Sequence, residues 1–313
     1  MRIAVIGPGA IGTLFAALLF RAGHEVWLLD RDPERAARLN TRGLRVEGLS
    51  GSWRAQVQAT ADLPHVPEPE LILICVKAYD TASAADSAAQ IPGAAPVLTL
   101  QNGLGNVETL ARRLGRGRIL GGATAMGATL LAAGRVRHAG LGETIIAEPG
   151  GRLTPRLRRV AGALKSALPV SLSEDLAGVL WTKAILNCGI NPVGALTRLR
   201  NGDLVRFPHA RRCVAAAVEE GAAVAAAKGI HLAYRNMGRR AEAACRATAE
   251  NINSMLQDIL LGRRTEVEAI NGAVVRAGRA ARVPTPMNAA LWRLVKALEE
   301  GAGRRVPESA LKR

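Results

Sequence analysis

Three polar residues, Lys183, Asn187 and Asn191, recur every four positions in a stretch that is otherwise almost entirely apolar. Residues four apart lie on one face of a helix, so a helix here would carry an amine and two amides in one line. Such a line is a poor core surface and a good surface for binding a polar small molecule. Lysine can also release a proton, which arginine effectively cannot. A solvated polar stripe is the alternative, and the apolar neighbours of these residues weigh against it.

A glycine-rich turn lies near the start of the chain, between a strand expected over residues 2–7 and a helix expected over residues 10–22. Gly7 permits a tight turn, Gly9 lets the backbone approach a pyrophosphate, and Gly12 lets the helix pack against the strand. The free N–H groups at the start of the helix would then bind the phosphates. We therefore predict a dinucleotide site that contains Gly7, Pro8, Gly9, Ala10, Ile11 and Gly12.

The end of the next expected strand, residues 25–30, gives two opposite indications about the coenzyme. Asp30 stands where an acidic side chain holds the ribose hydroxyls of NAD, and Arg31 follows it, where it could bind the 2′-phosphate of NADP. A carboxylate beside that phosphate would repel it unless Asp30 turns away. From these residues alone both coenzymes stay open, and Arg31 as a solvated loop residue is a third interpretation.

Two more polar residues lie just after apolar strands expected over residues 71–76 and 96–100. Lys77 and Asn102 come at the carboxyl ends of these strands, where open α/β sheets bind their ligands. Lys77 could hydrogen-bond a cofactor or a substrate, and the amide of Asn102 can both donate and accept. Position alone is also compatible with a charged strand end and with an ordinary Asn-Gly turn.

Two different sets of elements must position these residues. Strands and helices alternate as far as residue 173, which is typical of a mostly parallel, doubly wound sheet, and residues 118–129 are expected to form one of its strands. From residue 174 helical periods dominate. The predicted fold class is α/β, with a Rossmann-type dinucleotide-binding domain over residues 1–173 and an all-α substrate and catalytic domain over residues 174–313. The helices expected there cover 175–187, 192–199, 208–228, 234–261, 263–281 and 287–299, with breaks at prolines and glycines that include Pro192.

Composition excludes several classes of protein. The chain has 313 residues and a net charge of +16, but aromatic residues make up only 3% and the basic residues are spread along the sequence, so we expect no nucleic-acid partner. No apolar run is long enough for a membrane span and no secretory signal is visible, so we expect a cytoplasmic protein without a membrane partner. The four cysteines and five histidines show no metal-ligand spacing, so we expect no metal.

Taken together, these motifs resemble those of the ketopantoate reductases (2-dehydropantoate 2-reductases), and the likeness runs along the whole chain. It covers the glycine turn, Val76-Lys77-Ala78, Gln101-Asn102-Gly103, and Lys183 with Asn187 and Asn191-Pro192. Its most specific part is Ser254-Met-Leu-Gln-Asp258 and Arg264-Thr265-Glu266, followed by Ile270-Asn271-Gly272. Spacing alone would make Glu266 a surface carboxylate, whereas the resemblance makes it a functional residue.

The resemblance implies that NADPH reduces the C2 ketone of 2-dehydropantoate to pantoate, a step of pantothenate and coenzyme A biosynthesis. Lys183 and Glu266 would be the catalytic residues, the first as general acid and the second as a ligand of the substrate hydroxyl. Substrate binding would involve Asn102, Asn187, Asn191 and Ser254, and coenzyme binding would involve the glycine turn, Arg31, Lys77 and Asn102. The family usually has a small or neutral residue where this chain has Asp30. Because Arg31 matches the arginine of the family, NADP(H) is favoured, and NAD(H) stays open.

Other functions also stay open from the sequence. The chain could be a related two-domain NAD(P)-dependent reductase of another 2-keto acid, or a dehydrogenase of a β-hydroxyacid or an opine. It could also be a non-catalytic NADP(H) sensor, although every candidate catalytic residue is retained. The expected partner is a small keto acid, and the helical second domain offers surfaces for a homodimer.

Overall fold

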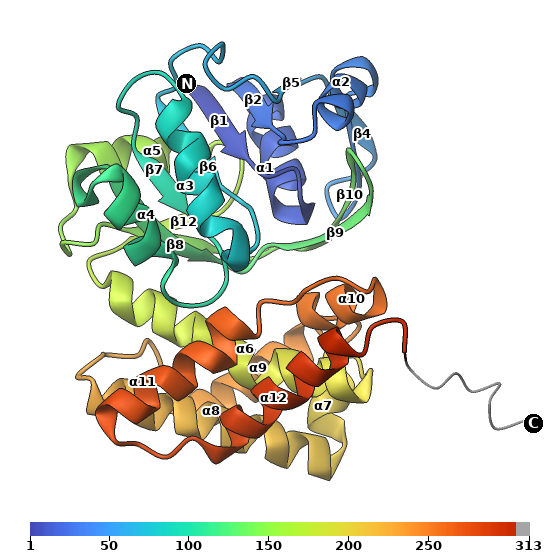
Figure 1. The fold of residues 1–313 in the computed structure, drawn as a ribbon, viewed down its shortest axis with the longest axis vertical. Coiled ribbons are helices and arrows are strands. Elements are labelled where there is room, and N and C mark those ends of the chain that lie inside the picture. The colour runs from blue at the N-terminus through green and yellow to red at the C-terminus, as the bar shows by residue number, and fades with distance from the viewer. Residues whose placement is uncertain (305–313) are drawn as a thin grey trace, which may run out of the picture. The chain divides into compact units, whose positions relative to one another are not determined.

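The computed structural model describes residues 1–304, which fold into two compact units (Figure 1). The first unit is Met1–Leu180 and the second begins at Trp181. The predicted second domain ran to residue 313, and its residues 305–313 lie outside the described residues. The domain boundary expected at residues 173 and 174 stays a prediction.

The first unit is built on an eight-stranded sheet of order β12-β11-β8-β7-β6-β1-β2-β5. Its neighbouring strands are parallel, except that β11 runs antiparallel to β8. The strand order reverses at β1, as in doubly wound sheets, so the predicted fold class is confirmed. The strands are β1 (Arg2–Ile6), β2 (Glu25–Leu29), β5 (Gln58–Thr60), β6 (Leu71–Ile74), β7 (Val97–Thr99), β8 (Ile119–Thr124), β11 (Thr144–Ala147) and β12 (Val170–Ser173).

Both faces of this sheet are covered by helices, because successive side chains of a strand point to opposite faces. Ile3 and Val5 of β1 pack in a core with residues of α1 and α5, whereas Ala4 and Ile6 pack in a second core with residues of α3 and α4. The central strands β1, β6 and β7 are therefore mostly apolar, as two-sided burial requires. The helical elements of this unit are α1 (Ala10–Arg21), α2 (Pro33–Arg42), α3 (Thr81–Gln90), α4 (Asn106–Leu114), α5 (Pro155–Lys165) and the 3-10 turns η1 (Ala78–Asp80) and η2 (Arg116–Arg118).

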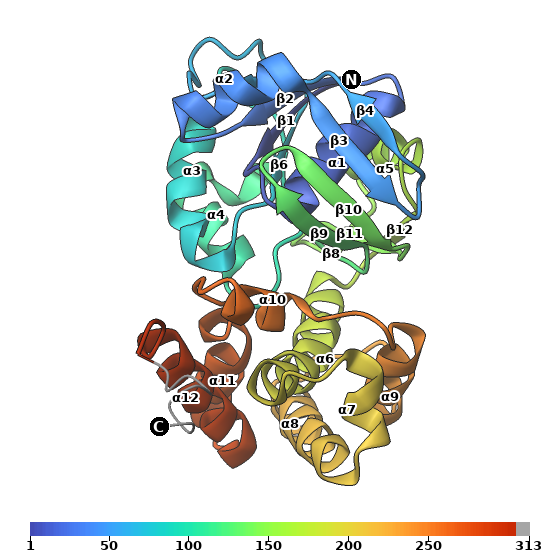
Figure 2. The same ribbon diagram turned by 90° about the vertical axis from the view of Figure 1, so that its right-hand side faces the viewer.

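A second sheet, of order β4-β3-β10-β9, contacts α1 and is not predicted by the sequence analysis (Figure 2). The single strand expected over residues 118–129 is wrong, because β8 ends at Thr124 and the next strand begins at Gly127 in this other sheet. The hydroxyl of Thr124 accepts a hydrogen bond from the backbone N–H of Met126 (3.2 Å), which bends the chain between the sheets. The strands are β3 (Leu44–Gly48), β4 (Trp53–Ala55), β9 (Gly127–Ala132) and β10 (Arg135–Gly140).

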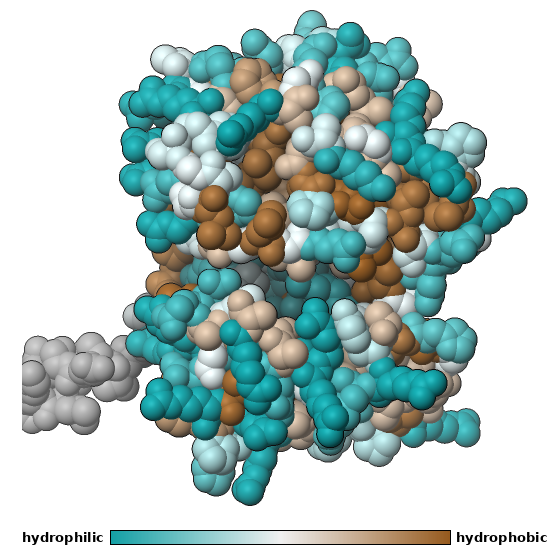
Figure 3. Space-filling view, turned by 180° about the vertical axis from the view of Figure 1, so that it is seen from behind, coloured by the Kyte–Doolittle hydropathy of each residue, from teal (hydrophilic) through white to brown (hydrophobic). Residues whose placement is uncertain are grey.

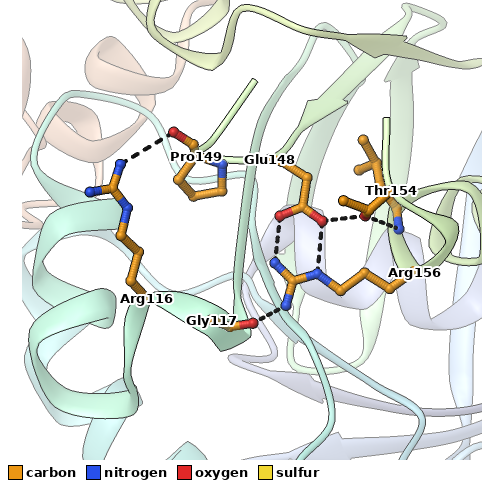
Figure 4. Close-up of polar contacts among 7 residues, drawn as sticks. Arg116, Gly117, Glu148, Pro149, Thr154 and Arg156 are labelled. Atoms are coloured by element: carbon orange, nitrogen blue, oxygen red, sulfur yellow. Dashed lines mark hydrogen bonds and ion pairs between the residues drawn. The ribbon is translucent and has the colours of Figure 1, made fainter. Parts of the chain in front are cut away.

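A partly buried ion pair holds α5 against the end of β11 (Figure 4). The Arg156 guanidinium donates to both carboxylate oxygens of Glu148, and its contact through Nε is 2.7 Å long. Thr154 also donates to Glu148 and accepts from the N–H of Leu157 (3.2 Å), so it caps α5. Arg156 donates further to the carbonyl of Gly117. These side-chain contacts add to the ladder that joins β11 to β8 and β12, and they hold the start of α5 near the end of β11.

In the second unit, every regular element from Trp181 to residue 304 is helical, which confirms the predicted helical domain. Helix α8 contacts α7, α9, α11 and α12 and forms the centre of the unit. Its buried residues recur every three or four positions, so one face of the helix packs against these neighbours. The helices are α6 (Leu176–Thr197), which begins in the first unit, α7 (Asn201–Arg206), α8 (Pro208–Ala227), α9 (Met237–Ala247), α10 (Ser254–Leu260), α11 (Ala273–Ala281) and α12 (Pro286–Glu300), with a π-helical turn η3 (Glu268–Gly272) before α11.

Helix α6 runs through Pro192, so the expected break at this residue is wrong. Proline has no N–H, and the carbonyl of Cys188 therefore lacks its usual donor within the helix. The side-chain amide of Asn271 supplies that donor at 2.8 Å. A contact with a residue far along the chain thus lets the helix continue past the proline.

Two other predicted helices are interrupted. The helix expected over residues 234–261 is α9 and α10 with a loop between them, because Asn253 accepts a hydrogen bond from the N–H of Leu256 (3.0 Å) and starts a new helix. The helix expected over residues 263–281 begins only at Glu268. Thr265 before it is held by Glu299, which accepts from its N–H (2.7 Å) and its hydroxyl (2.6 Å).

No helix among residues 1–304 combines the length and the apolar character that a membrane crossing needs. In the view of Figure 3, hydrophobic patches lie on the first unit, and hydrophilic side chains cover most of the second. Many arginines of both units are paired with surface carboxylates, for example Arg135 with Glu47 (2.8 Å) and Arg211 with Glu242 (2.6 Å). Each such exposed pair contributes little stability, but it places a negative charge beside an arginine and so reduces the local positive charge.

Candidate active site

The glycine turn between β1 and α1 has the geometry that the sequence predicts. Gly7 has φ +105°, and a Cβ there would lie 2.7 Å from Cγ1 of Val76. A Cβ at Gly12 would collide with the carbonyl oxygen of Gly7. A Cβ at Gly9, in contrast, would meet only the carbonyl of Cys75 at 3.9 Å, so the backbone stays accessible there. Side chains at the first and third glycines are therefore excluded by packing, and the middle glycine leaves room for a ligand.

The first turn of α1 offers unused backbone donors. Its N-cap is Gly9, which has no capping side chain, and no acidic residue lies in the first turn. The first hydrogen bond within the helix is donated by the N–H of Thr13 to the carbonyl of Gly9 (2.9 Å). The N–H groups of Ala10, Ile11 and Gly12 therefore precede the hydrogen-bonded part of the helix. Together with the positive end of the helix dipole, they fit the pyrophosphate of a dinucleotide.

Asp30, after β2, does not point an available carboxylate at a ligand. Its oxygen Oδ1 accepts from Nη2 of Arg35 (2.5 Å) and from the N–H of Asp32 (3.0 Å), and Oδ2 accepts from Nε of Arg35. The Asp30 side chain is fully buried, whereas the neighbouring side chain of Arg31 is 80% exposed. Arg31 makes a long ion pair with Asp80, 3.9 Å from Nη1 to Oδ1. Of these two neighbouring side chains after β2, the one exposed to solvent is therefore the cation, Arg31.

A buried amide network fixes the backbone next to Lys77 and Asn102, at the ends of β6 and β7. Gln101 donates to the carbonyl of Val76 (3.0 Å) and to the hydroxyl of Thr81 (2.9 Å). The side chain of Asn106 donates to the carbonyl of Asn102 (3.0 Å). Lys77 and Asn102 are both half-buried and belong to neighbouring strand ends. The structure therefore brings these two predicted residues to one edge of the first unit.

In the second unit, Lys183, Asn187 and Asn191 all lie on the continuous helix α6, as the spacing predicts. Asn187 and Asn191 are buried and Lys183 is half-buried. Burial lowers the pKa of the Lys183 ammonium, and the positive charge of Arg240 lowers this pKa further. A lysine with a lowered pKa gives up a proton more readily, as a general acid must.

Ser254 and Glu266 lie on segments that are tied to α6. Ser254 is the exposed first residue of α10, and the preceding Asn253 donates to the carbonyl of Ile190 (3.5 Å), next to Asn191. Glu266 is 6% exposed, so the surface position that spacing alone suggests is wrong.

The segment after Glu266 is tied to α6 by the hydrogen bond from Asn271 to Cys188, next to Asn187 (2.8 Å). The second unit therefore fastens both segments to the part of α6 that carries the amides.

Arg240 is a residue of this site that the sequence analysis misses. It lies on α9, and its guanidinium carbon is 4.8 Å from the ring centre of Tyr234. The loop before α9 is joined to α6 by a hydrogen bond from the N–H of Ala233 to the hydroxyl of Thr182 (3.1 Å), beside Lys183. Among the described residues, no acceptor lies within hydrogen-bond distance of the buried Nε of Arg240. No spacing in the sequence links Arg240 to Lys183, because the two residues lie on different helices, α9 and α6, whose approach depends on the tertiary fold.

A doubly wound sheet with a glycine turn, in one chain with a helical unit that carries a half-buried lysine, is typical of a two-domain dinucleotide-binding oxidoreductase. The chain belongs to the ketopantoate reductase family: residues 3–151 match "Ketopantoate reductase PanE/ApbA" and residues 175–299 match its C-terminal part.

A 2-dehydropantoate 2-reductase of Pyrococcus abyssi is 37% identical over 97% of this chain and 100% of its own length. Among solved structures, a PanE/ApbA family ketopantoate reductase from Ralstonia eutropha JMP134 is 33% identical, with a TM-score of 0.87, and covers 97% of this chain and 100% of its own. D-mandelate dehydrogenase with NADH and anilino(oxo)acetate is 26% identical, with a TM-score of 0.90 and the same coverage. The likeness therefore extends over both units.

Proposed function

We propose that this protein reduces the C2 ketone of 2-dehydropantoate to the alcohol of pantoate, with NADPH as the coenzyme. The observation that carries the proposal is the arrangement on α6, where Lys183 lies in line with two buried amides. An ammonium group and neutral amides suit a substrate that has a carboxylate, a ketone and a hydroxyl. The curated relative from Pyrococcus abyssi supports this substrate by its name.

We propose NADPH and not NADH as the coenzyme because both carboxylate oxygens of Asp30 accept hydrogen bonds from Arg35. The conflict between Asp30 and Arg31 in the sequence disappears if Asp30 does not face the ribose. Arg31 is then the residue that binds the 2′-phosphate, and the glycine turn with the start of α1 binds the pyrophosphate. Lys77 and Asn102 complete the coenzyme side of the site.

When bound, NADPH supplies the hydride that adds to C2 of the substrate. The electron pair of the C=O double bond moves onto oxygen, and the Lys183 ammonium stabilises this developing charge and donates its proton to it. The neutral amine left on Lys183 is protonated again by solvent. Glu266 holds the substrate hydroxyl, and the polar ligands of the substrate are Asn102, Asn187, Asn191 and Ser254.

The alternative is the reduction of another 2-keto acid, and the likeness to D-mandelate dehydrogenase favours it as the second candidate. The Lys183 chemistry would be the same, because it requires only a ketone next to a carboxylate. What differs is the group that Glu266 would face, which is a hydroxyl in 2-dehydropantoate and an aromatic ring in phenylglyoxylate.

We further propose that residues 1–173 bind the coenzyme and that the helical region from residue 174 binds the substrate. A cytoplasmic location and a homodimer formed by the helical unit stay predictions, as does the expectation that nucleic acid is not a partner. Fractionation of cells, sedimentation of the purified protein and a duplex-binding titration would test them in turn.

The decisive experiment follows the nicotinamide absorbance of purified protein with 2-dehydropantoate and with phenylglyoxylate, each with NADPH and with NADH. Efficient turnover of 2-dehydropantoate with NADPH is expected. Efficient turnover of phenylglyoxylate alone would move the assignment to the alternative. If neither acid is reduced although the coenzyme binds, the proposed reaction is wrong.

A further inference from the structure

Asp30 occupies the position from which a carboxylate holds the ribose hydroxyls of NAD, yet each of its oxygens is already in use. Three donors surround the carboxylate: Nε and Nη2 of Arg35, the latter at 2.5 Å, and the backbone N–H of Asp32 at 3.0 Å. The bidentate geometry is the strong form of an arginine–carboxylate pair. With a side chain that is 0% exposed, Asp30 presents no free acceptor to solvent.

The backbone around this pair is fixed by local capping. Asp32 is the N-cap of α2 and accepts a hydrogen bond from the N–H of Arg35 (3.1 Å), and Pro33 occupies the first turn. Arg35 therefore starts from a defined position, and its side chain reaches back to the end of β2. Its own side chain is 36% exposed, so the guanidinium bridges the buried carboxylate and the surface.

The pairing changes the charge that a coenzyme would meet. An unpaired carboxylate at residue 30 would repel the 2′-phosphate of NADPH, whereas a carboxylate neutralised by Arg35 does not. A carboxylate that loses its partner is costly to keep buried, so it turns toward solvent and becomes available to ribose hydroxyls.

We propose that Arg35 determines the coenzyme selectivity of this protein by holding the Asp30 carboxylate inside the turn between β2 and α2. Arg35 is a positioning residue, because it acts through Asp30 and not through its own contact with the coenzyme. The inference rests on the proposed function in so far as the protein binds NADPH in preference to NADH.

The test is the binding of NADPH and of NADH without substrate, measured by titration calorimetry with the wild type and Arg35→Met. Loss of the guanidinium is expected to lower the ratio of NADPH affinity to NADH affinity by about tenfold or more, because a like charge then faces the 2′-phosphate. The double variant Asp30→Asn/Arg35→Met removes that charge and is expected to restore most of the ratio.

Arg38→Met is the matched control, because Arg38 is one turn further along α2, is 51% exposed and pairs with Glu34 at 3.5 Å. It removes the same charge from the same helix and is expected to leave the ratio within about twofold. Where Arg35→Met does not fold, Arg35→Lys keeps the charge without the bidentate contact and is expected to lower the ratio less.

The outcomes separate the role of Arg35 from the proposed preference for NADPH. A wild type that prefers NADPH, combined with an unchanged ratio in Arg35→Met or in Arg35→Lys, overturns the role of Arg35 and leaves the proposed coenzyme intact. A double variant that does not regain the ratio also overturns it, because Asp30 would then not be the group through which Arg35 acts. A wild type that prefers NADH contradicts the proposed coenzyme and this inference together.

Discussion

The side-chain amide of Asn271 donates a hydrogen bond to the carbonyl oxygen of Cys188, four residues before Pro192 in α6. That carbonyl is the one whose helical donor the proline removes. The same amide donates to Asn288 (3.0 Å), so a single buried side chain joins α6, the π-helical turn and α12. The position of Glu266, just before that turn, therefore depends on a helix defect elsewhere in the chain.

Replacement of Asn271 by alanine should destabilise the fold by about 1–3 kcal/mol, because it leaves a buried carbonyl without a donor. Pro192→Ala in the same chain restores a backbone N–H and should recover part of this loss. Urea unfolding of the two single variants and the double variant measures the coupling. Additive effects of the two substitutions would show that Asn271 does not act through the Cys188 carbonyl.

Lys183→Ala should lower kcat by about a hundredfold or more, as the loss of a general acid does. Coenzyme affinity should change little, because the glycine turn and Arg31 belong to the first unit. Steady-state kinetics with 2-dehydropantoate and a separate NADPH titration test both statements. A kcat close to that of the wild type would remove Lys183 from the mechanism.

Arg240→Met should move the alkaline limb of the pH–rate profile to higher pH. Lys183 acts as an acid, so the rate falls as pH rises through its pKa, which burial and the charge of Arg240 both lower. Removal of the arginine leaves burial alone, and the pKa of Lys183 then rises toward its ordinary value. Arg239→Met, an exposed neighbour on α9, is the control and should leave the limb in place.

Arg31→Ala should weaken NADPH binding more than NADH binding, because only NADPH carries the 2′-phosphate. The exposed position of this side chain makes a folding defect a poor explanation for any change. Fluorescence titration with both nucleotides gives the two affinities. Equal weakening of both would show that Arg31 does not bind the phosphate.

His138, buried in β10, should make stability depend on pH. Burial lowers the pKa of its imidazole in the folded state. Below about pH 6.5 the unfolded chain therefore binds a proton here that the folded chain does not, and stability falls as pH decreases from there toward the lowered value. Urea midpoints at pH 7.5 and pH 5.5 should differ less in His138→Leu than in the wild type. His231→Leu, at an exposed site, should not reduce the difference.

Local pattern was enough to predict the parts of the site that lie within one element. The turn at Gly7 and Gly12 and the spacing of Lys183 and Asn187 depend on neighbouring residues, and the structure places them as the sequence indicates. The fold class followed for the same reason, because hydrophobic periods report the burial of each face.

Side-chain contacts between distant segments could not be predicted. Pro192 indicated a break because the sequence does not reveal that Asn271 reaches Cys188. Asp30 gave a conflicting indication about the coenzyme because its partner Arg35 depends on a rotamer, not on a motif. Arg240 was not predicted because it lies on α9, far from Lys183 in the sequence, and its charge acts on Lys183 only through the way the helices pack.

If Arg35 holds Asp30 as proposed, the pairing also has a consequence for the order in which the two residues could be acquired. An ancestor with a neutral residue at position 30 could gain Arg35 first and keep its coenzyme, whereas aspartate alone would have lost the phosphate. Once both were present, the arginine could no longer be replaced without consequence, although the aspartate still could. Relatives that have aspartate at this position should therefore also have the arginine five residues later.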